Sequence, residues 1–187
     1  METLKKRPWL ERNYYCNYLA QSSFYTFYSI RMLAMAIANT STDQKEYFRR
    51  SLEHFKEENG HDSIAIMDLK SLGEDIKNYS EKGMTRALWE PQFYKLQKNN
   101  TALLGYILAL EYLPVKCFGW LDKTLSEKYG RLCSKFVHVH AEEDPDHVEK
   151  CLEQINQLSE FEKIEIFKNY EQTCSSFKYF LLDLEIN

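Results

Sequence analysis

Apolar side chains recur at helical spacing along almost the whole chain, and this periodicity limits its fold more than any other feature. The clearest case is "YYCNYLAQSSFYTFYSIRMLAMAIA", which ends at Ala38. No stretch of useful length alternates apolar and polar residues as a half-buried strand does. With only six Gly and four Pro, the chain has few of the residues that interrupt helices. The sequence therefore predicts an all-α fold.

The pattern predicts a single domain over residues 1–187, with about seven helices around one core. In the second predicted helix, Gly60 is a point of local kinking and Gly73 is the C-cap. Pro114 should end the fourth, because proline disfavours helical geometry in the residue before it. The expected helices cover about 9–38, 42–72, 85–96, 100–113 and 118–129, and a last pattern over 134–184 that is broken near 157–160.

Charge and cysteine usage narrow the class of protein. The net charge is -4, and Lys and Arg are scattered, which argues against a nucleic-acid partner. The five cysteines form no C-x2-C pair, as expected for reduced thiols of a cytosolic protein. The apolar run 101–115 is shorter than the roughly 20 residues of a membrane span, and no secretory signal follows the N-terminal charges. We expect a cytoplasmic protein that binds no membrane.

The segment "FVHVHAEEDPDHVEK" contains a candidate metal motif. His140, Asp144 and His147 stand at positions i, i+4 and i+7, which share one helix face. Burying two imidazoles and a carboxylate without partners costs several kcal/mol, and a metal ion would satisfy all three. The same face continues downstream as the apolar stripe of Cys151, Ile155 and Leu158.

Pro145 leaves a second reading of this segment open. Proline inside a helix removes one backbone hydrogen bond and crowds the preceding turn. Pro145 could instead be the first helical residue, with Asp144 as its N-cap and His140 on the incoming segment. The shared face would then be weaker for His140 than for Asp144 and His147. A helix N-terminus with capping acids and a solvated histidine is the structural alternative.

The predicted helix 42–72 repeats this spacing with His54, Glu58 and His61, near an apolar stripe. Two copies of His-x3-acid-x2-His use four of the five histidines, more than composition alone would readily produce. A solvated charged face is the alternative for Glu58 and His61, because "KEENGHD" is polar throughout. His54 stays open between ligand, support for a ligand and surface residue. The fifth histidine, His138, points away from His140 and is expected to be structural.

Glu111 lies inside the apolar run "LLGYILALEYL". A carboxylate there is either neutral with a raised pKa or paired with a positive charge, which a core Arg or Lys could supply. If its helix packs against the other two, Glu111 completes a set of carboxylates and imidazoles suited to non-haem iron or manganese. The aromatic residues of the first helix are expected mainly in the core.

In this order, these segments resemble the haem-oxygenase-like diiron oxidases and oxygenases, relatives of the TenA and PqqC proteins with a seven-helix fold. The resemblance covers nearly the whole chain, and its most specific part is the His-x3-Asp-x2-His motif. The matching segments are "YLAQSSFYTFYSIRMLAMA", "HFKEENGHDSIAIMDLKSLG", "LLGYILALEYL" and "FVHVHAEEDPDHVE".

The resemblance implies two iron ions and no haem, with manganese as an alternative metal and the second ion in a labile site. One ion would lie near Glu58, His61 and His140. The other would lie near Asp144 and His147, with Glu111 bridging the ions or completing the second site. Whether His54 takes part is left open by the family's variable spacing. A haem oxygenase would need a histidine in the first helix, and none of the five precedes residue 54.

The implied function is an O2-activating oxidase or oxygenase acting on a small organic substrate. The expected partners are O2, that substrate and an external reductant, and a homodimer is one assembly left open. Tyr25 and Tyr28 of the first helix are candidates to line the substrate cavity. Two alternatives are a non-catalytic helical partner-binding protein with a structural metal, and a metal-free TenA-like hydrolase with a nucleophilic cysteine. Whether the protein consumes one of its own tyrosines is open.

Overall fold

The computed structural model describes residues 1–185, which form seven long α-helices and one short one. Single turns of 3-10 helix occur at 76–78, 100–102 and 131–133. Within the described residues no strand occurs, so the all-α prediction is confirmed. The helices are α1 (Glu2–Lys5), α2 (Arg12–Asn39), α3 (Lys45–Glu58), α4 (His61–Ser71), α5 (Gly83–Lys98), α6 (Leu103–Tyr129), α7 (Lys135–Asn156) and α8 (Glu160–Asp183).

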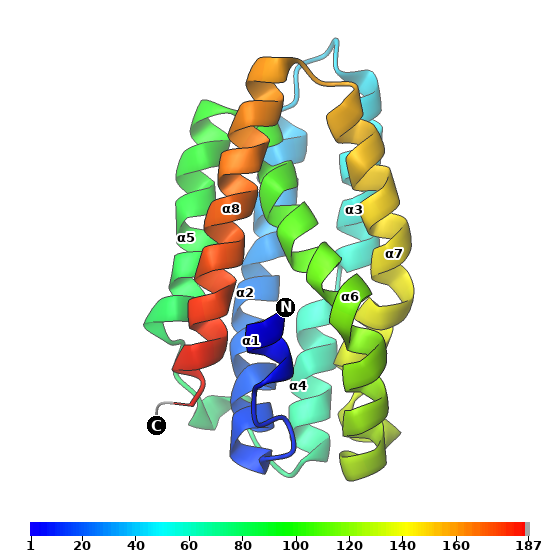
Figure 1. Cartoon of the computed structure of the whole chain (residues 1–187). Helices are drawn as coiled ribbons and strands as arrows, with labels where there is room; N and C mark the ends of the chain where they lie inside the picture. The colour runs from blue at the N-terminus through cyan, green and yellow to red at the C-terminus, as the bar shows by residue number, and fades with distance from the viewer. Residues whose placement is uncertain (186–187) are drawn as a thin grey trace.

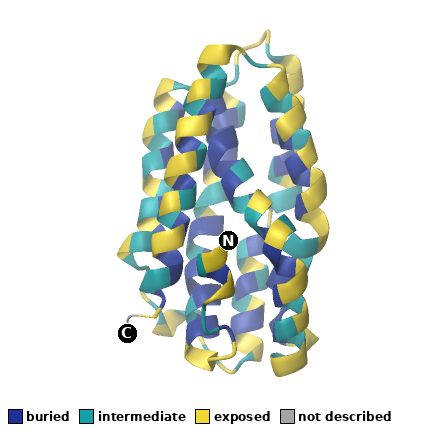
Figure 2. Cartoon of the chain, in the orientation of Figure 1, coloured by how far each residue is buried: buried dark blue, intermediate teal, exposed yellow. Residues whose placement is uncertain are grey.

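Two long helices organise the bundle. Helix α2 packs against α3, α4 and α5, and helix α6 packs against α7 and α8. Figure 1 shows the long helices running along a common axis, with α5 and α8 on one side and α3, α4 and α7 on the other. In Figure 2 the buried residues gather on the inward sides of these helices. An internal cavity is lined mainly by residues of α2 and α6.

An aromatic cluster fills the core around the first half of α2. The ring of Trp9 packs edge-on against Tyr14 and Tyr18, at centroid distances of 5.2 and 4.9 Å. The polar atoms of three of these buried rings find backbone acceptors: Trp9 Nε1 donates to Leu4 O at 2.8 Å, Tyr14 Oη to Leu181 O at 3.0 Å, and Tyr15 Oη to Cys133 O at 2.7 Å. Large rings with bonded polar tips anchor α2 firmly.

The predicted helix 42–72 is wrong as one element, because the chain breaks between α3 and α4. Gly60 adopts φ 103°, a left-handed conformation that L side chains rarely take, and it is the N-cap of α4. Glu58 is consequently the last residue of one helix and His61 the first of the next. The predicted end at Gly73 is confirmed, since Gly73 follows the helix with φ 82°.

The prediction that Pro114 ends a helix is also wrong, because α6 runs through it from Leu103 to Tyr129. Proline cannot donate a backbone hydrogen bond to Leu110, four residues earlier, which costs the helix one bond but not its path. The buried side chains before and after Pro114 hold both halves in the core, and these include Leu104, Ile107, Phe118, Leu121 and Leu125.

Helix α6 is longer than the apolar run 101–115, whose short length was the reason to expect no membrane span. With its preceding turn it spans Asn100–Tyr129, 30 residues that are long and apolar enough to cross a membrane by length and composition. Of its most apolar window, 61% is buried inside the bundle, which is typical of a core helix. The absence of a membrane partner stays a prediction.

Helix α7 settles the placement of Pro145. The helix is continuous from Lys135 to Asn156 with Pro145 inside it, so His140, Asp144 and His147 all lie on one helix. The predicted break near 157–160 is confirmed at the start of α8. There Ser159 and Glu162 form a capping box, in which each side chain bonds the other's backbone N–H.

Candidate metal centre

Four helices deliver the predicted ligands to one place beside the α2–α6 core. Helix α3 supplies His54 and Glu58 from its last turns, helix α4 supplies His61 as its first residue, and helix α6 supplies Glu111. Helix α7 supplies His140, Asp144 and His147. Since Gly60 turns the chain between α3 and α4, Glu58 and His61 reach the site from two separate helices.

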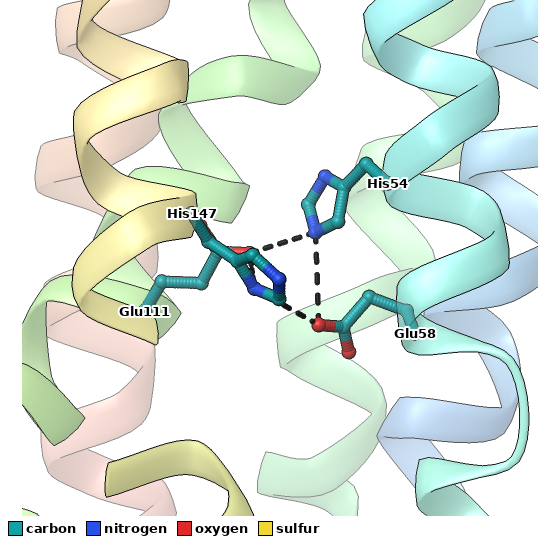
Figure 3. A group of neighbouring side chains, drawn as sticks. All are labelled: His54, Glu58, Glu111 and His147. Atoms are coloured by element: carbon teal, nitrogen blue, oxygen red, sulfur yellow. Dashed lines mark ion pairs between the residues drawn. The ribbon is translucent and has the colours of Figure 1, made fainter. Parts of the chain in front are cut away.

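The first group of neighbouring donors consists of His54, Glu58, Glu111 and His147. Figure 3 shows the four side chains converging from α3, α6 and α7. His54 Nε2 lies 2.8 Å from Glu111 Oε1 and 3.7 Å from Glu58 Oε1. His147 Nδ1 lies 3.4 Å from Glu58 Oε1 and 3.6 Å from Glu111 Oε1. Two imidazoles and two carboxylates thus face a common point.

The second group consists of Glu58, His61 and His140. His61 Nδ1 lies 3.0 Å from Glu58 Oε2. The ring of His140 packs 4.9 Å from that of His61, and its Nδ1 donates to Phe136 O at 2.7 Å. That bond places the proton on Nδ1 and leaves Nε2 of the neutral ring as an acceptor or ligand. Glu58 belongs to both groups, with Oε1 facing one and Oε2 the other.

Asp144 lies beside the two groups and is fully buried. The imidazole of His147 lies close to it, with Nδ1 3.8 Å from Asp144 Oδ1. Neither carboxylate oxygen has a hydrogen-bond partner within the described residues. Burial, followed by the charges of Glu111 and Glu58, raises the pKa of Asp144 to about 10. Without a cation nearby, Asp144 therefore holds its proton at neutral pH.

The other carboxylates of the site are ionised and the histidine next to them is charged. Burial opposes charge on His54, but Glu111 and Glu58 outweigh it and raise the pKa of His54 to about 10. Burial likewise disfavours a charged Glu58, yet its contacts with His54 and His61 hold the pKa of Glu58 well below its usual range. Protonated imidazole thus takes the place of a cation in the metal-free protein.

The donor set fits an iron ion better than it fits a purely structural network. Among the described residues, five buried ligand atoms have no hydrogen-bond partner: Glu58 Oε1, Glu111 Oε2, both Asp144 oxygens and His147 Nδ1. His54 Nε2 and His61 Nδ1 contact only the carboxylates of Glu111 and Glu58. Buried polar atoms are rarely left unpaired, so a concentration of this kind calls for a ligand. Imidazole and carboxylate together are typical ligands of non-haem iron and manganese in helical bundles. All six predicted ligands and His54 are brought together, while their metal-binding role stays a prediction.

Three supporting acids were missed by sequence reasoning. Asp68 on α4 accepts a hydrogen bond from Phe136 N at 2.7 Å and so caps the start of α7. Glu57 lies 3.5 Å from His147 Nε2 and is itself held by Arg50 at 2.7 Å. Glu143 lies 3.6 Å from His61 Nε2. Only Asp68 left a signal in the sequence, because it stands two helical turns after His61, on the same face.

A cavity of about 60 Å³ adjoins the ligands. Tyr25 lines it, as predicted, together with Ser29 and Tyr106, whose hydroxyls lie 2.9 Å apart. Tyr28 does not line it; its ring stacks on Trp89 of α5, with the ring centroids 3.6 Å apart. The other lining residues are mostly apolar, including Leu33, Leu103, Ile107, Leu110, Phe118, Phe136 and Phe177.

The remaining histidine and the cysteines lie apart from the ligand groups. His138 Nδ1 lies 3.1 Å from Asp122 Oδ2 with its side chain 41% exposed, as expected of a structural residue. No cysteine lines the cavity among the described residues. Four of the five free cysteines are buried, and Cys174 is half-buried.

Comparisons with known proteins identify the family and the fold of the chain. A family profile described as an iron-containing redox enzyme matches residues 16–173. A solved structure from Shewanella denitrificans OS217, described as a domain of unknown function with a heme oxygenase-like fold, superposes with a TM-score of 0.84. It has 19% sequence identity and covers 98% of this chain and 86% of its own, which confirms the predicted fold. No curated protein matches the sequence.

Proposed function

Because the chain belongs to the family of iron-containing redox enzymes, we propose that it is a non-haem diiron oxidase or oxygenase that uses O2 to oxidise a small organic substrate. The observation that carries this proposal is the pair of donor groups that share Glu58. Two groups joined by one carboxylate can hold two ions close together, which a site for a single structural metal would not need.

Each ion would have its own set of ligands. One would be held by His61, His140 and Glu58 Oε2, and the other by His54, His147, Glu111 and Glu58 Oε1. Asp144 would join the second set, since it lies next to His147. Bound iron supplies the electrons and open coordination positions that O2 reduction requires.

The protein's own residues prepare the site for that chemistry. The Phe136 carbonyl fixes the tautomer of His140, and Glu57 faces the nitrogen of His147 that points away from the centre. The apolar lining of the cavity excludes water, which protects reactive species from side reactions. The Ser29 and Tyr106 hydroxyls offer a substrate a neutral polar partner.

The cavity lining favours an oxidase over a cysteine-dependent hydrolase. Such a hydrolase needs a thiol within reach of its substrate, and no described cysteine lines the cavity. Burial also raises the pKa of Cys151, on the ligand helix, which opposes formation of a nucleophilic thiolate. The proposed partners are therefore O2, a small organic molecule and an external reductant.

O2 consumption by the iron-loaded protein tests the proposal. The chain is loaded anaerobically with Fe(II), desalted, and mixed with O2 and ascorbate while O2 is followed with an electrode. We expect bound iron and O2 uptake in the wild type, and the loss of both in His147→Ala. His138→Ala is the matched control on the same helix and should behave as the wild type. Bound iron that never consumes O2 would favour a structural metal in a partner-binding protein.

A further inference from the structure

The cavity beside the ligands is too small for most organic substrates on its own. Ligand pockets usually measure about 300–1,000 Å³, whereas this cavity measures about 60 Å³. A second hollow of about 340 Å³ opens at the surface, lined by residues of α1, α6 and α8. We call it the entrance groove. Its volume lies within the range of ligand pockets, and it lies next to the inner cavity.

One aromatic side chain lines both spaces. Phe177 contacts the inner cavity and the entrance groove, and it is 5% exposed. On α6, consecutive residues line the two spaces, since Leu113 lines the groove and Pro114 lines the cavity. The α8 part of the wall between them is therefore the ring of Phe177, which can change rotamer.

The lining residues of the groove and the cavity indicate which class of ligand could move from the surface to the metal centre. The groove is lined mainly by apolar and aromatic side chains, among them Tyr170 and Leu181. Its charged groups among the described residues are the side chain of Lys178 and the N-terminal ammonium of Met1. Apart from the candidate ligands, the described residues that line the inner cavity carry no charged side chain. Burying an ionic group there without a partner would be costly.

We propose that the entrance groove is the outer part of the substrate site and that Phe177 gates the passage from it to the metal centre. The ligand class is an uncharged, largely apolar organic molecule, flat or extended, whose outer end stays in the groove. That this molecule is a substrate rests on the proposed function. The groove can be tested without it, in the metal-free protein.

Iron removal by a small neutral chelator tests the gate. Bipyridine is flat, uncharged and apolar, so it should reach bound Fe(II) through the groove, whereas the larger, sulfonated ferrozine takes up iron only after it dissociates. We expect Phe177→Ala to speed bipyridine removal severalfold and Phe177→Trp to slow it, with ferrozine rates changed much less. Phe167→Ala on the exposed side of α8 is the control. If bipyridine and ferrozine rates change in parallel, Phe177 is structural and the gate is refuted.

A second measurement tests the groove in the metal-free protein, so that failure to bind iron does not decide it. Cys174 lines the groove and is half-buried, while the other four cysteines are buried. We expect toluene to slow the alkylation of Cys174 by N-ethylmaleimide, and Cys174→Ser to abolish the labelling. Unchanged labelling at saturating toluene would overturn the groove as an apolar site. Absence of bound iron with toluene protection would instead refute the proposed function alone.

Discussion

Two buried regions of this protein differ in whether their polar atoms have hydrogen-bond partners. In the aromatic cluster at the start of α2, the polar tips of Trp9, Tyr14 and Tyr15 each donate to a backbone carbonyl, at 2.7 to 3.0 Å. In the candidate metal centre, five ligand atoms of Glu58, Glu111, Asp144 and His147 are buried without hydrogen-bond partners among the described residues. Both regions lie in the same helical bundle, so the difference comes from the side chains and not from the fold.

The difference separates residues that stabilise the protein from residues that prepare it for a ligand. A bonded tyrosine combines apolar burial with a satisfied hydroxyl, which favours folding. A buried carboxylate such as Asp144 disfavours folding until something pairs with it. We therefore expect substitutions in the aromatic cluster to change stability, and conservative substitutions in the metal centre to change metal binding instead.

The largest loss of stability is expected from Trp9→Ala. Trp9 is 2% exposed and packs against two tyrosine rings. Removing such a side chain typically costs about 3–5 kcal/mol. Urea denaturation of the metal-free protein measures the change. The iron bound per folded molecule should stay that of the wild type. A loss of iron binding without a loss of stability would contradict the claim that the aromatic cluster contributes to stability and not to metal binding.

An intermediate loss is expected from Asp68→Ala, because Asp68 is a buried acid that joins α4 to α7. Its carboxylate caps α7, the helix that carries three candidate ligands. Leaving the Phe136 N–H without a partner should cost about 1–3 kcal/mol in urea denaturation. Asp68→Asn keeps an acceptor oxygen and should lose clearly less, so equal losses in the two variants would contradict a capping role.

The stability difference between the wild type and Asp68→Asn should depend on pH. Burial raises the pKa of Asp68 from 3.8 to about 7 in the folded protein. A raised folded-state pKa stabilises the protein below the unfolded value, and this contribution is lost as pH rises through the folded value. The wild type should therefore lose stability relative to Asp68→Asn between pH 5 and pH 8. A constant difference across that interval, measured in urea, would show that Asp68 does not titrate there.

A smaller effect is expected from Tyr15→Phe, which keeps the ring and removes only the hydrogen bond to Cys133 O. Loss of one such bond typically costs about 0.5–1.5 kcal/mol, and somewhat more when the acceptor is buried. Urea denaturation should show this loss with iron binding unchanged. A stabilised variant would mean that the satisfied hydroxyl contributes nothing.

The smallest effect on the metal-free protein is expected from Asp144→Asn. Asp144 already holds a proton at neutral pH, so an uncharged amide of similar size should change stability by no more than about 0.5 kcal/mol. Added Fe(II) should stabilise this variant less than the wild type, because one anionic ligand is gone. A large loss of stability in the metal-free variant would show that Asp144 is a structural residue.

The sequence predicted the helices and the candidate ligands better than it predicted helix ends. Periodicity identified the long helices and the inward faces of His140, Asp144 and His147, because both depend on local spacing. The break at Gly60 and the passage of α6 through Pro114 depend on packing between distant segments. For the same reason, the shared role of Glu58 and the cap by Asp68 were not visible before the helices were assembled.

The central claim is that Glu58 joins two metal sites, and the stoichiometry of Fe(II) binding tests it most directly. Anaerobic titration with the iron content measured by absorption and Mössbauer spectroscopy should give two ions per wild-type chain. His61→Ala should lose mainly the ion next to His140, whereas Glu58→Ala should weaken both ions. A Glu58→Ala protein that keeps one ion at wild-type affinity, or a wild type that binds only one, would contradict the account.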